Sequence, residues 1–557
     1  MGTGDFTRYV TEDRILGILL KERAKWLGER RQVGRDRSRV YADLCSMLPS
    51  RRTWVTPGKN RRSRLTNDRT RRLRDAETAL RLTLARDRAA IPRPPYFDRL
   101  GEFISGIRSA VRSGGITLAR PATTAIYKDR EELDDRVVVT FRPISVYDDL
   151  RTKVLLKLAT DYLTALLDPL FHEEILSYRR RRDYHGEHPR EKYVTTAGDA
   201  VTNILQFRRE HPEVWVAECD IRKFYDIVDH REVMKALGRL LDEGGIDRER
   251  AGGAIAILEA YLDSYSFRDS VLEVSRREVF WDPYVRGLAR TIRAGRKKVE
   301  CRFGWVDESE LPGDLSRIGI PQGGVPSTLI CNILMNDVDR SVVDPSDRDR
   351  LFNRFGDDII LMHASEEGCR RLFGAYKDSL AAHGLVYHPE RSVSDFKDGT
   401  RLLPGYWDEK TKAPFRWGPG EGNAADWIGF VGYEIRSNGE VRLRKSTLAK
   451  QFDRICFRYN RIKHLDEPIR TGIPTLMQGL DRIGWSILKF DRLDFNPSSR
   501  RQMHLLDRYR HNKAAKALRH LSTLPVINGD REVKAPAKKP SSFASVLASR
   551  KDRKKGR

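Results

Sequence analysis

The sequence has few cysteines and no long apolar run, and these absences exclude several classes of protein. Six cysteines are scattered along 557 residues without a C-x-x-C pair, so neither a zinc site nor a disulfide framework is predicted. No apolar run is long and charge-free enough to span a bilayer, and no signal peptide precedes the first charged residues. Phe6 stands where a myristoylation signal needs Ser or Thr. We find no internal repeats, and we expect a cytoplasmic protein without a membrane partner.

Acidic residues are outnumbered, and this imbalance indicates the kind of partner. The chain has 104 Lys and Arg against 79 Asp and Glu, a formal net charge of +25. Basic surfaces bind phosphate backbones because they release condensed counterions. A nucleic acid is therefore the expected partner. The length predicts about three domains.

Two adjacent carboxylates stand out in residues 354–362, RFGDDIILM. Apolar β-formers on both sides of Gly-Asp-Asp predict two strands joined by a tight turn. Such a hairpin holds Asp357 and Asp358 at the edge of a sheet. Because like charges repel, a site that keeps both ionised normally supplies cations.

A third carboxylate lies upstream, in residues 215–226, WVAECDIRKFYD. Asp220 is placed at the end of an apolar strand. One acid after a strand, together with an acid doublet on a hairpin, suits two divalent ions at a phosphoryl-transfer centre. Oxygen ligands favour Mg²⁺, with Mn²⁺ as a substitute.

Residues 319–334, GIPQGGVPSTLICNIL, predict a Gly/Pro loop that enters a buried helix. The three segments, in this order, resemble the palm motifs of reverse transcriptases, above all the bacterial enzymes related to group II introns. Four further segments within roughly residues 121–445 are similar to motifs of the family: RPIS (142–145) and SYR (177–179) to fingers motifs, GLVYHPERS (384–392) to the GL-x-x-NPEK segment, and FVGYEI (430–435) to the primer grip.

The resemblance implies roles for individual residues. Asp220, Asp357 and Asp358 would be catalytic and bind two metal ions, with the backbone carbonyl of Ile221 as a further ligand. Tyr225 would collide with a ribose 2′-hydroxyl, which predicts a preference for deoxynucleotides. The other implied nucleotide-binding residues are Arg142, Phe224, Gln322, Gly323 and Arg391, and the primer grip would be Val431, Gly432 and Tyr433. Lys128 is a further candidate triphosphate contact, although its spacing to Arg142 is longer than the pattern requires.

The sequence departs from the family at several positions. Arg391 replaces a lysine that is a candidate proton donor, and arginine holds its proton too tightly to donate easily, so Lys397 is a second candidate. Phe355-Gly356 replaces the usual Tyr-Ala, and residues 326–328 replace the usual x-Ser-Pro. We find no endonuclease or maturase signature, so the closest likeness is to chromosomal bacterial reverse transcriptases of the phage-defence type.

The predicted fold is α+β, a right-hand polymerase with fingers, palm and thumb. The run Arg179, Arg180, Arg181 and Arg182 is expected to bind nucleic acid, because adjacent guanidinium groups repel unless phosphate neutralises them. The predicted parts are a helical basic N-terminal extension (1–120), fingers and palm (121–445) with an insertion at about 265–315 near the nucleic-acid channel, a helical thumb (446–527) and a basic disordered tail (528–557).

We therefore predict an RNA-directed DNA polymerase that adds dNTPs to a primer 3′-hydroxyl, in bacterial antiviral defence, with a cognate RNA as template and DNA as product. The motifs leave three alternatives open: an RNA-dependent RNA polymerase, DNA synthesis without a template from a protein primer, and an inactive RNA-binding scaffold. Gly324, Thr328 and Asn332 fit the G-x3-T-x3-N spacing of the first alternative. The sequence also leaves open a partner protein or a homo-oligomer.

Overall fold

The computed structural model describes most of the chain up to residue 451. The described residues are 5–25, 38–55, 69–177, 179, 197–291, 298–304, 315–444, 446–448 and 451. All of them belong to one compact unit, Met1–Leu506. Most of the predicted thumb, all of the predicted tail and Arg180–Arg182 lie outside the described residues.

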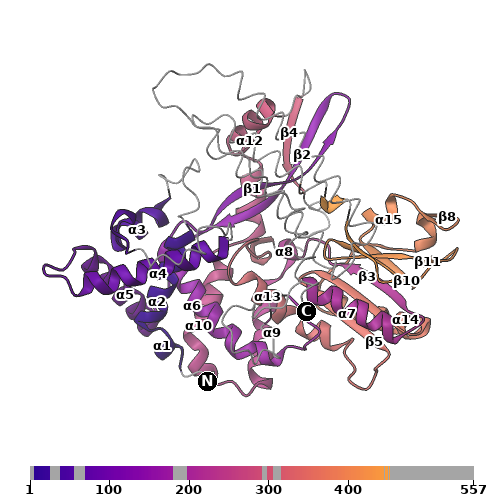
Figure 1. Ribbon diagram of the computed structural model, residues 1–557, viewed down its shortest axis with the longest axis horizontal. Helices are drawn as coiled ribbons and strands as arrows, with labels where there is room; N and C mark the ends of the chain where they lie inside the picture. Colours follow the sequence, from indigo (N-terminus) through magenta and orange to yellow (C-terminus); the bar gives the residue numbers. More distant parts are fainter. Residues whose placement is uncertain are drawn as a thin grey trace, which may run out of the picture. The chain divides into compact units, whose positions relative to one another are not determined.

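The described residues mix helices and sheets, as expected of an α+β fold (Figure 1). Five helices, α1 to α5, precede the first described strand, and ten follow it. The helices are α1 (Phe6–Tyr9), α2 (Glu12–Lys25), α3 (Arg39–Met47), α4 (Arg69–Arg88), α5 (Tyr96–Ser113), α6 (Leu150–Leu167), α7 (Ala197–Glu210), α8 (Phe224–Ile227), α9 (His230–Glu243), α10 (Arg248–Asp263), α11 (Glu273–Ser275), α12 (Glu278–Thr291), α13 (Ser327–Arg340), α14 (Glu366–Ala382) and α15 (Gly405–Asp408).

One hydrophobic core joins the N-terminal helices to the helices near the acid motifs. The apolar repeat of α6 is buried as its spacing predicts, with Val154, Leu158 and Tyr162 each at most 1% exposed. The Asp149 side chain caps the start of α6 by accepting a hydrogen bond from the Thr152 backbone N–H at 2.7 Å. Helix α6 packs against α10 and α2, so the N-terminal helices share this core with helices from the middle of the chain.

The central sheet carries the acid motifs. Its strands run in the order β11 (Ala424–Ala425), β10 (Thr411–Trp417), β3 (Trp215–Asp220), β6 (Asp358–His363), β5 (Arg350–Phe355), with β7 (Glu390–Arg391) paired to β10. Strands β3, β5 and β6 are joined by antiparallel pairing. Helix α14 packs against β3, β6 and β10, while α7 packs against β5 (Figure 1). The strand interiors are buried, which explains their near-continuous apolar sequence.

A second sheet contains the RPIS motif and part of the predicted insertion. Strands β1 (Ala122–Glu132) and β2 (Arg136–Val146) form an antiparallel hairpin, and β4 (Lys298–Phe303) adds parallel to β2. Helix α12 packs against β4 (Figure 1), and Phe141 contacts Trp281 and Tyr284 of this helix. The insertion therefore extends and supports this sheet.

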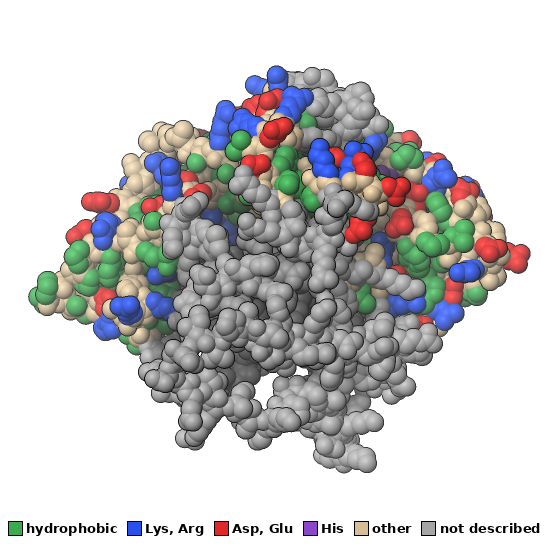
Figure 2. Space-filling model, turned by 90° about the horizontal axis from the view of Figure 1, so that it is seen from above, with side chains coloured by type: hydrophobic (Ala, Val, Ile, Leu, Met, Phe, Trp, Pro, Cys, Tyr) green, Lys and Arg blue, Asp and Glu red, His purple; other side chains and the backbone are tan. Residues whose placement is uncertain are grey.

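Two small sheets complete the described strands. Strands β12 (Trp427–Phe430), β13 (Tyr433–Arg436) and β14 (Val441–Leu443) form an antiparallel meander, and β8 (Lys397–Asp398) pairs with β9 (Arg401–Leu402). Among the described helices, none combines the length and the apolar character that a bilayer span needs. Figure 2 shows one face on which the described Lys and Arg side chains are interspersed with Asp and Glu.

Candidate active site

The three predicted acids meet at one end of the central sheet. The antiparallel register of β3 and β6 places Asp220 directly opposite Asp358. Asp357 lies in the two-residue turn between β5 and β6. Gly356 in this turn has a φ of 75°, a conformation that favours glycine, which explains why the hairpin carries Gly before the acids. The sequence prediction of a hairpin that presents two carboxylates beside Asp220 is confirmed.

The two acids of the doublet have raised pKa values. Asp358 reaches solvent but is closely surrounded by protein, and this desolvation, together with repulsion from Asp357 and Asp220, raises its pKa to about 7. Burial and the charge of Asp220 likewise raise the pKa of Asp357. Three carboxylates at such a site need cations to balance their negative charge when all are ionised.

A lysine that the sequence motifs did not indicate supplies one positive charge. The Lys410 ammonium lies 2.7 Å from the Asp220 carboxylate, and attraction by all three acids raises the pKa of Lys410 against the effect of burial. No group of three His, Cys, Asp or Glu in the described parts of the chain is arranged so that it could already hold a metal ion.

The donor set nevertheless fits hard divalent ions. The site offers carboxylate oxygens from Asp220, Asp357 and Asp358. The raised pKa values of Asp357 and Asp358 indicate that additional positive charge would stabilise the ionised doublet. Ile221, the predicted carbonyl ligand, follows Asp220 and is 2% exposed. Oxygen ligands of this kind suit Mg²⁺ and Mn²⁺.

A buried ion pair links the acid hairpin to helix α13. Arg354 forms two hydrogen bonds to Asp339 of α13, at 2.8 and 2.7 Å, and both side chains are 0% exposed. The same guanidinium donates to the carbonyl oxygen of Gly356 at 3.1 Å. Helix α13 begins just after the PQGG loop, so one arginine ties this segment to the turn that carries Asp357.

The segment that resembles GL-x-x-NPEK runs alongside the strand end that carries Asp220. The Arg222 backbone N–H donates to the Val386 carbonyl at 2.7 Å, and the His388 N–H donates to the Asp220 carbonyl at 3.1 Å. These main-chain bonds fix the position of Asp220. The Asp220 N–H also donates to Thr411 Oγ1 at 3.4 Å, which joins β3 to the start of β10.

Positively charged side chains converge beside the acids. The pKa of Lys223 is lowered to about 8 by burial and by the neighbouring charges of Lys128, Arg142 and Arg222, against the attraction of Asp226. A Cβ at Gly304 would stand 3.5 Å from the Lys128 ammonium and 3.9 Å from that of Lys223. The predicted pair, Arg142 and Lys128, is therefore brought together despite its long spacing. Lys223 is a third member that no motif indicated.

The predicted residues of the PQGG loop lie next to this cluster. Gln322 Nε2 donates to Asp226 Oδ1 at 3.1 Å, and the Gln322 carbonyl accepts from the Ser145 N–H at 3.1 Å. Gly323 has a φ of 86°, and a Cβ there would contact Ile144 at 3.5 Å. The loop thus joins the sheet of β1 and β2 to α8, the short helix that follows the acid strand.

Two neighbouring aromatic residues have different environments. Tyr225 is half-buried, and its backbone carbonyl accepts a hydrogen bond from the Ile320 N–H at 2.8 Å. Phe224 is 1% exposed and packs edge-on against Tyr225. The Phe224 ring belongs to the core, so the predicted nucleotide contact of Phe224 would have to come from its backbone.

The two proposed proton donors do not contact the acids. The Arg391 guanidinium lies 3.5 Å from Asp395 and over the ring of Phe396. Lys397 donates to the carbonyls of Gly420 and Ala424 at 2.5 and 2.7 Å. Arg391 and Lys397 therefore contact nearby protein groups and not the three acids. The lysine that contacts the acids is Lys410.

The predicted primer-grip residues form the turn of the β12–β13 hairpin. Val431 and Gly432 have φ angles of 43° and 85°, and Tyr433 is 8% exposed. Glu218 of β3 accepts hydrogen bonds from the Gly429 N–H at 3.3 Å and from Lys412 at 2.6 Å. One buried carboxylate therefore fixes this hairpin against the strand that carries Asp220.

The prediction that Arg179 binds nucleic acid is wrong in this structure. Its side chain is 3% exposed and forms an ion pair with Asp168 at 2.7 Å. It also donates to the backbone carbonyls of Asp168, Phe171 and His172. These contacts neutralise the guanidinium inside the protein, so phosphate is not needed for that purpose. Arg180–Arg182 lie outside the described residues.

We expect Arg179→Met to weaken folding and to leave intrinsic RNA affinity unchanged. Removing one partner leaves Asp168 buried without its charge partner, which should cost about 3 kcal/mol of unfolding free energy. Urea denaturation measures this loss, and filter binding with a generic single-stranded RNA at low temperature measures affinity. A large loss of affinity by the folded variant would restore the nucleic-acid role.

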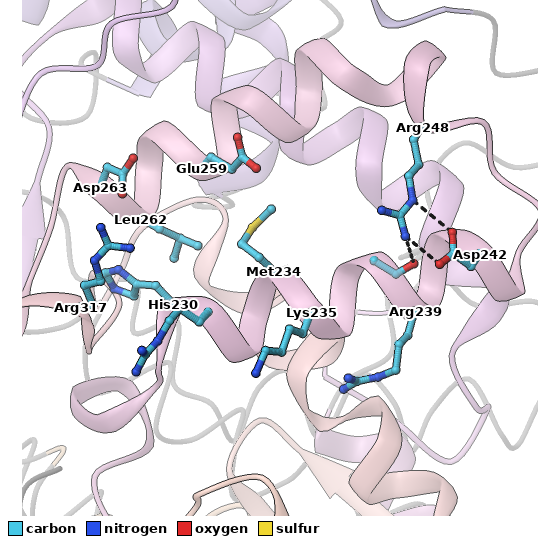
Figure 3. Close-up of a pocket in the computed structure, with 12 residues that line it drawn as sticks. His230, Met234, Lys235, Arg239, Asp242, Arg248, Glu259, Leu262, Asp263 and Arg317 are labelled. Atoms are coloured by element: carbon cyan, nitrogen blue, oxygen red, sulfur yellow. Dashed lines mark hydrogen bonds and ion pairs between the residues drawn. The ribbon is translucent and has the colours of Figure 1, made fainter. Parts of the chain in front are cut away.

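A separate hollow lies between α9 and α10 (Figure 3). Its volume is about 790 Å³, and its described lining includes none of the three acids. Several of its cations are already paired: Arg248 with Asp242 at 2.7 Å and Arg239 with Asp337 at 2.6 Å. We therefore place the candidate active site at the acids, where the charge is unbalanced.

Comparisons with known proteins add little to this geometry. No protein-family model and no curated protein matches the chain. Among solved structures, the chain is 12% identical to telomerase from Candida albicans in complex with a fragment of telomeric RNA, over 78% of this chain and 66% of that chain, with a TM-score of 0.32. It is 14% identical to apo telomerase from Candida tropicalis, over 87% of this chain and 78% of that chain, also with a TM-score of 0.32. Likenesses this weak carry no argument, so the function is inferred from the chain's own residues.

Proposed function

We propose that this protein is an RNA-directed DNA polymerase that extends a primer 3′-hydroxyl by phosphoryl transfer. The single observation that carries the proposal is the meeting of Asp220 with the Asp357–Asp358 turn at one end of a sheet. These acids are far apart in sequence, and burial and mutual repulsion raise the pKa values of the doublet. Clusters of this kind are typical of sites that handle phosphates with divalent ions.

Each group of residues has a distinct task in this proposal. Asp220 and Asp357 would hold two Mg²⁺ ions, with Asp358 completing the negative charge. When bound, Mg²⁺ would neutralise charge at the attacking and leaving oxygens. Arg142, with Lys128 and Lys223 beside it, would bind and orient the triphosphate of the incoming nucleotide, since the three cations lie together and the charge of Arg142 acts on Asp357.

The remaining predicted residues would position the two nucleic-acid strands. Gln322 and Gly323 would lie under the templating pair, because the loop bridges the β1–β2 sheet and α8, the helix that follows the acid strand. The Val431–Gly432 turn would contact the primer, and Glu218 fixes its distance from the acids. Positioning of this kind supplies much of the catalysis in phosphoryl transfer.

A cognate RNA template, a bacterial reverse-transcriptase lineage and a role in antiviral defence complete the proposal. The net charge of +25 supports an RNA partner, and the motif order supports the lineage. The defence role rests on the likeness to phage-defence enzymes and on the lack of an endonuclease or maturase signature in the sequence. Nucleotide omission, with sequencing of the product and of any co-purified RNA, tests whether DNA synthesis copies a bound RNA. A product complementary to the bound RNA supports templated synthesis. A product that still forms on omission of the templated nucleotides would favour synthesis without a template.

Sugar choice separates the proposal from an RNA polymerase, whose Gly-Asp-Asp turn this chain shares. We expect the wild-type protein to prefer dNTPs. We also expect Tyr225→Ala to lower this preference about tenfold or more, because a ring that blocks the 2′-hydroxyl is removed. Primer extension with dNTPs and NTPs measures the ratio of kcat/KM values. Tyr225→Phe keeps the ring and serves as the matched control. A wild-type preference for NTPs would favour the RNA polymerase.

A further inference from the structure

Lys410 occupies a position at the acid cluster that no motif explains. Its ammonium lies 2.7 Å from Asp220, and Asp357 and Asp358 also attract it. Lys410 therefore already provides part of the positive charge that the acids require. A divalent ion bound by the same carboxylates would be repelled by this ammonium.

The backbone next to Lys410 is fixed by neighbouring contacts, whereas most of its side chain is exposed to solvent. Thr411 Oγ1 accepts a hydrogen bond from the Asp220 N–H at 3.4 Å, and Lys412 forms a buried ion pair with Glu218 at 2.6 Å. In contrast, the Lys410 side chain is 58% exposed. Its four-carbon stem can swing into solvent without disturbing β10.

We propose that Lys410 is the resident counter-cation of the acid triad and releases Asp220 when divalent ions bind. In this arrangement, Lys410 stabilises the metal-free protein and raises the divalent concentration needed to fill the site. This inference rests on the proposed function, because it assumes that the acids bind metal. It adds a residue that sets the metal requirement, and it assigns the lysine no part in bond making.

The test is metal-dependent thermal stability of the full-length protein, which does not require polymerase activity. Wild type and Lys410→Met are melted in chelator and in a Mg²⁺ series at constant ionic strength, with Mn²⁺ as a second probe. In chelator we expect Lys410→Met to melt at a lower temperature than wild type, because three carboxylates lose their ammonium. Its half-maximal Mg²⁺ concentration should be about tenfold lower, since a like charge near the ion is removed.

Lys235→Met is the matched control. Lys235 is an exposed lysine paired with Glu232 at 2.8 Å, so its removal changes the net charge equally but should leave the Mg²⁺ response unchanged. A Lys410→Met curve that superimposes on the wild-type curve would overturn the inference alone. If neither Mg²⁺ nor Mn²⁺ stabilises the wild type, the metal site of the proposed function fails as well, and the inference fails with it.

Discussion

Asp357→Asn should abolish DNA synthesis while leaving the fold intact. The substitution keeps the shape of the side chain but removes a charge that a divalent ion needs, so the rate should fall at least about a thousandfold. Because burial and the charge of Asp220 raise the pKa of Asp357, the neutral side chain relieves repulsion. The metal-free variant should therefore melt at the same temperature as wild type or higher. Primer extension and thermal melting in chelator check the two halves of this prediction.

Loss of DNA synthesis without loss of thermal stability would show that the substitution acts on the active site and not on folding. Asp395→Asn is the control, because Asp395 is an exposed acid 3.5 Å from Arg391 and should affect neither property. If the Asp357→Asn protein kept its DNA synthesis, the acid cluster would not be the active site. If the Asp357→Asn protein lost DNA synthesis but kept the antiviral effect of the wild type in cells, the protein would act as an RNA-binding scaffold.

The largest loss of stability is expected at the buried pair behind the hairpin. Asp339→Ala leaves Arg354 charged and uncompensated in a fully buried position, which should cost about 3–5 kcal/mol of unfolding free energy. Urea denaturation measures this cost. Glu243→Ala removes the partner of the neighbouring Arg340 at an exposed pair and should cost less than about 1 kcal/mol.

A double variant separates stability from positioning. Arg354→Met with Asp339→Leu removes both charges and should recover most of the stability, since a buried pair is often replaceable by apolar side chains. It should not recover activity, because the Gly356 carbonyl loses the donor that fixes the turn. A stable and fully active double variant would show that Arg354 has no role in positioning the acids.

Local patterns predicted the acid site well because each acid lies at the end of a short strand or in the turn beside it. Asp220 ends β3, and the doublet sits at a turn that Gly356 makes possible, so strand and turn signals were sufficient. The apolar spacing of α6 likewise predicted its buried face. These elements are set by residues close together in the chain.

The errors arose where distant residues determine the environment. Arg179 looked like part of a basic run, but Asp168 and three carbonyl groups enclose it. Lys410 lies 190 residues from Asp220, and only the pairing of β10 with β3 brings the two together. The Phe224 ring is 1% exposed because it packs in the core that elements distant in sequence build together. Sequence spacing alone contains none of this information.

Anomalous diffraction from crystals of the full-length protein grown with Mn²⁺ and a non-hydrolysable dNTP tests the central claim most directly. We predict Mn²⁺ peaks in contact with Asp220 and Asp357, with the triphosphate reaching toward Arg142. Manganese bound elsewhere in the protein, with Asp220, Asp357 and Asp358 making no contact to it, would contradict the account.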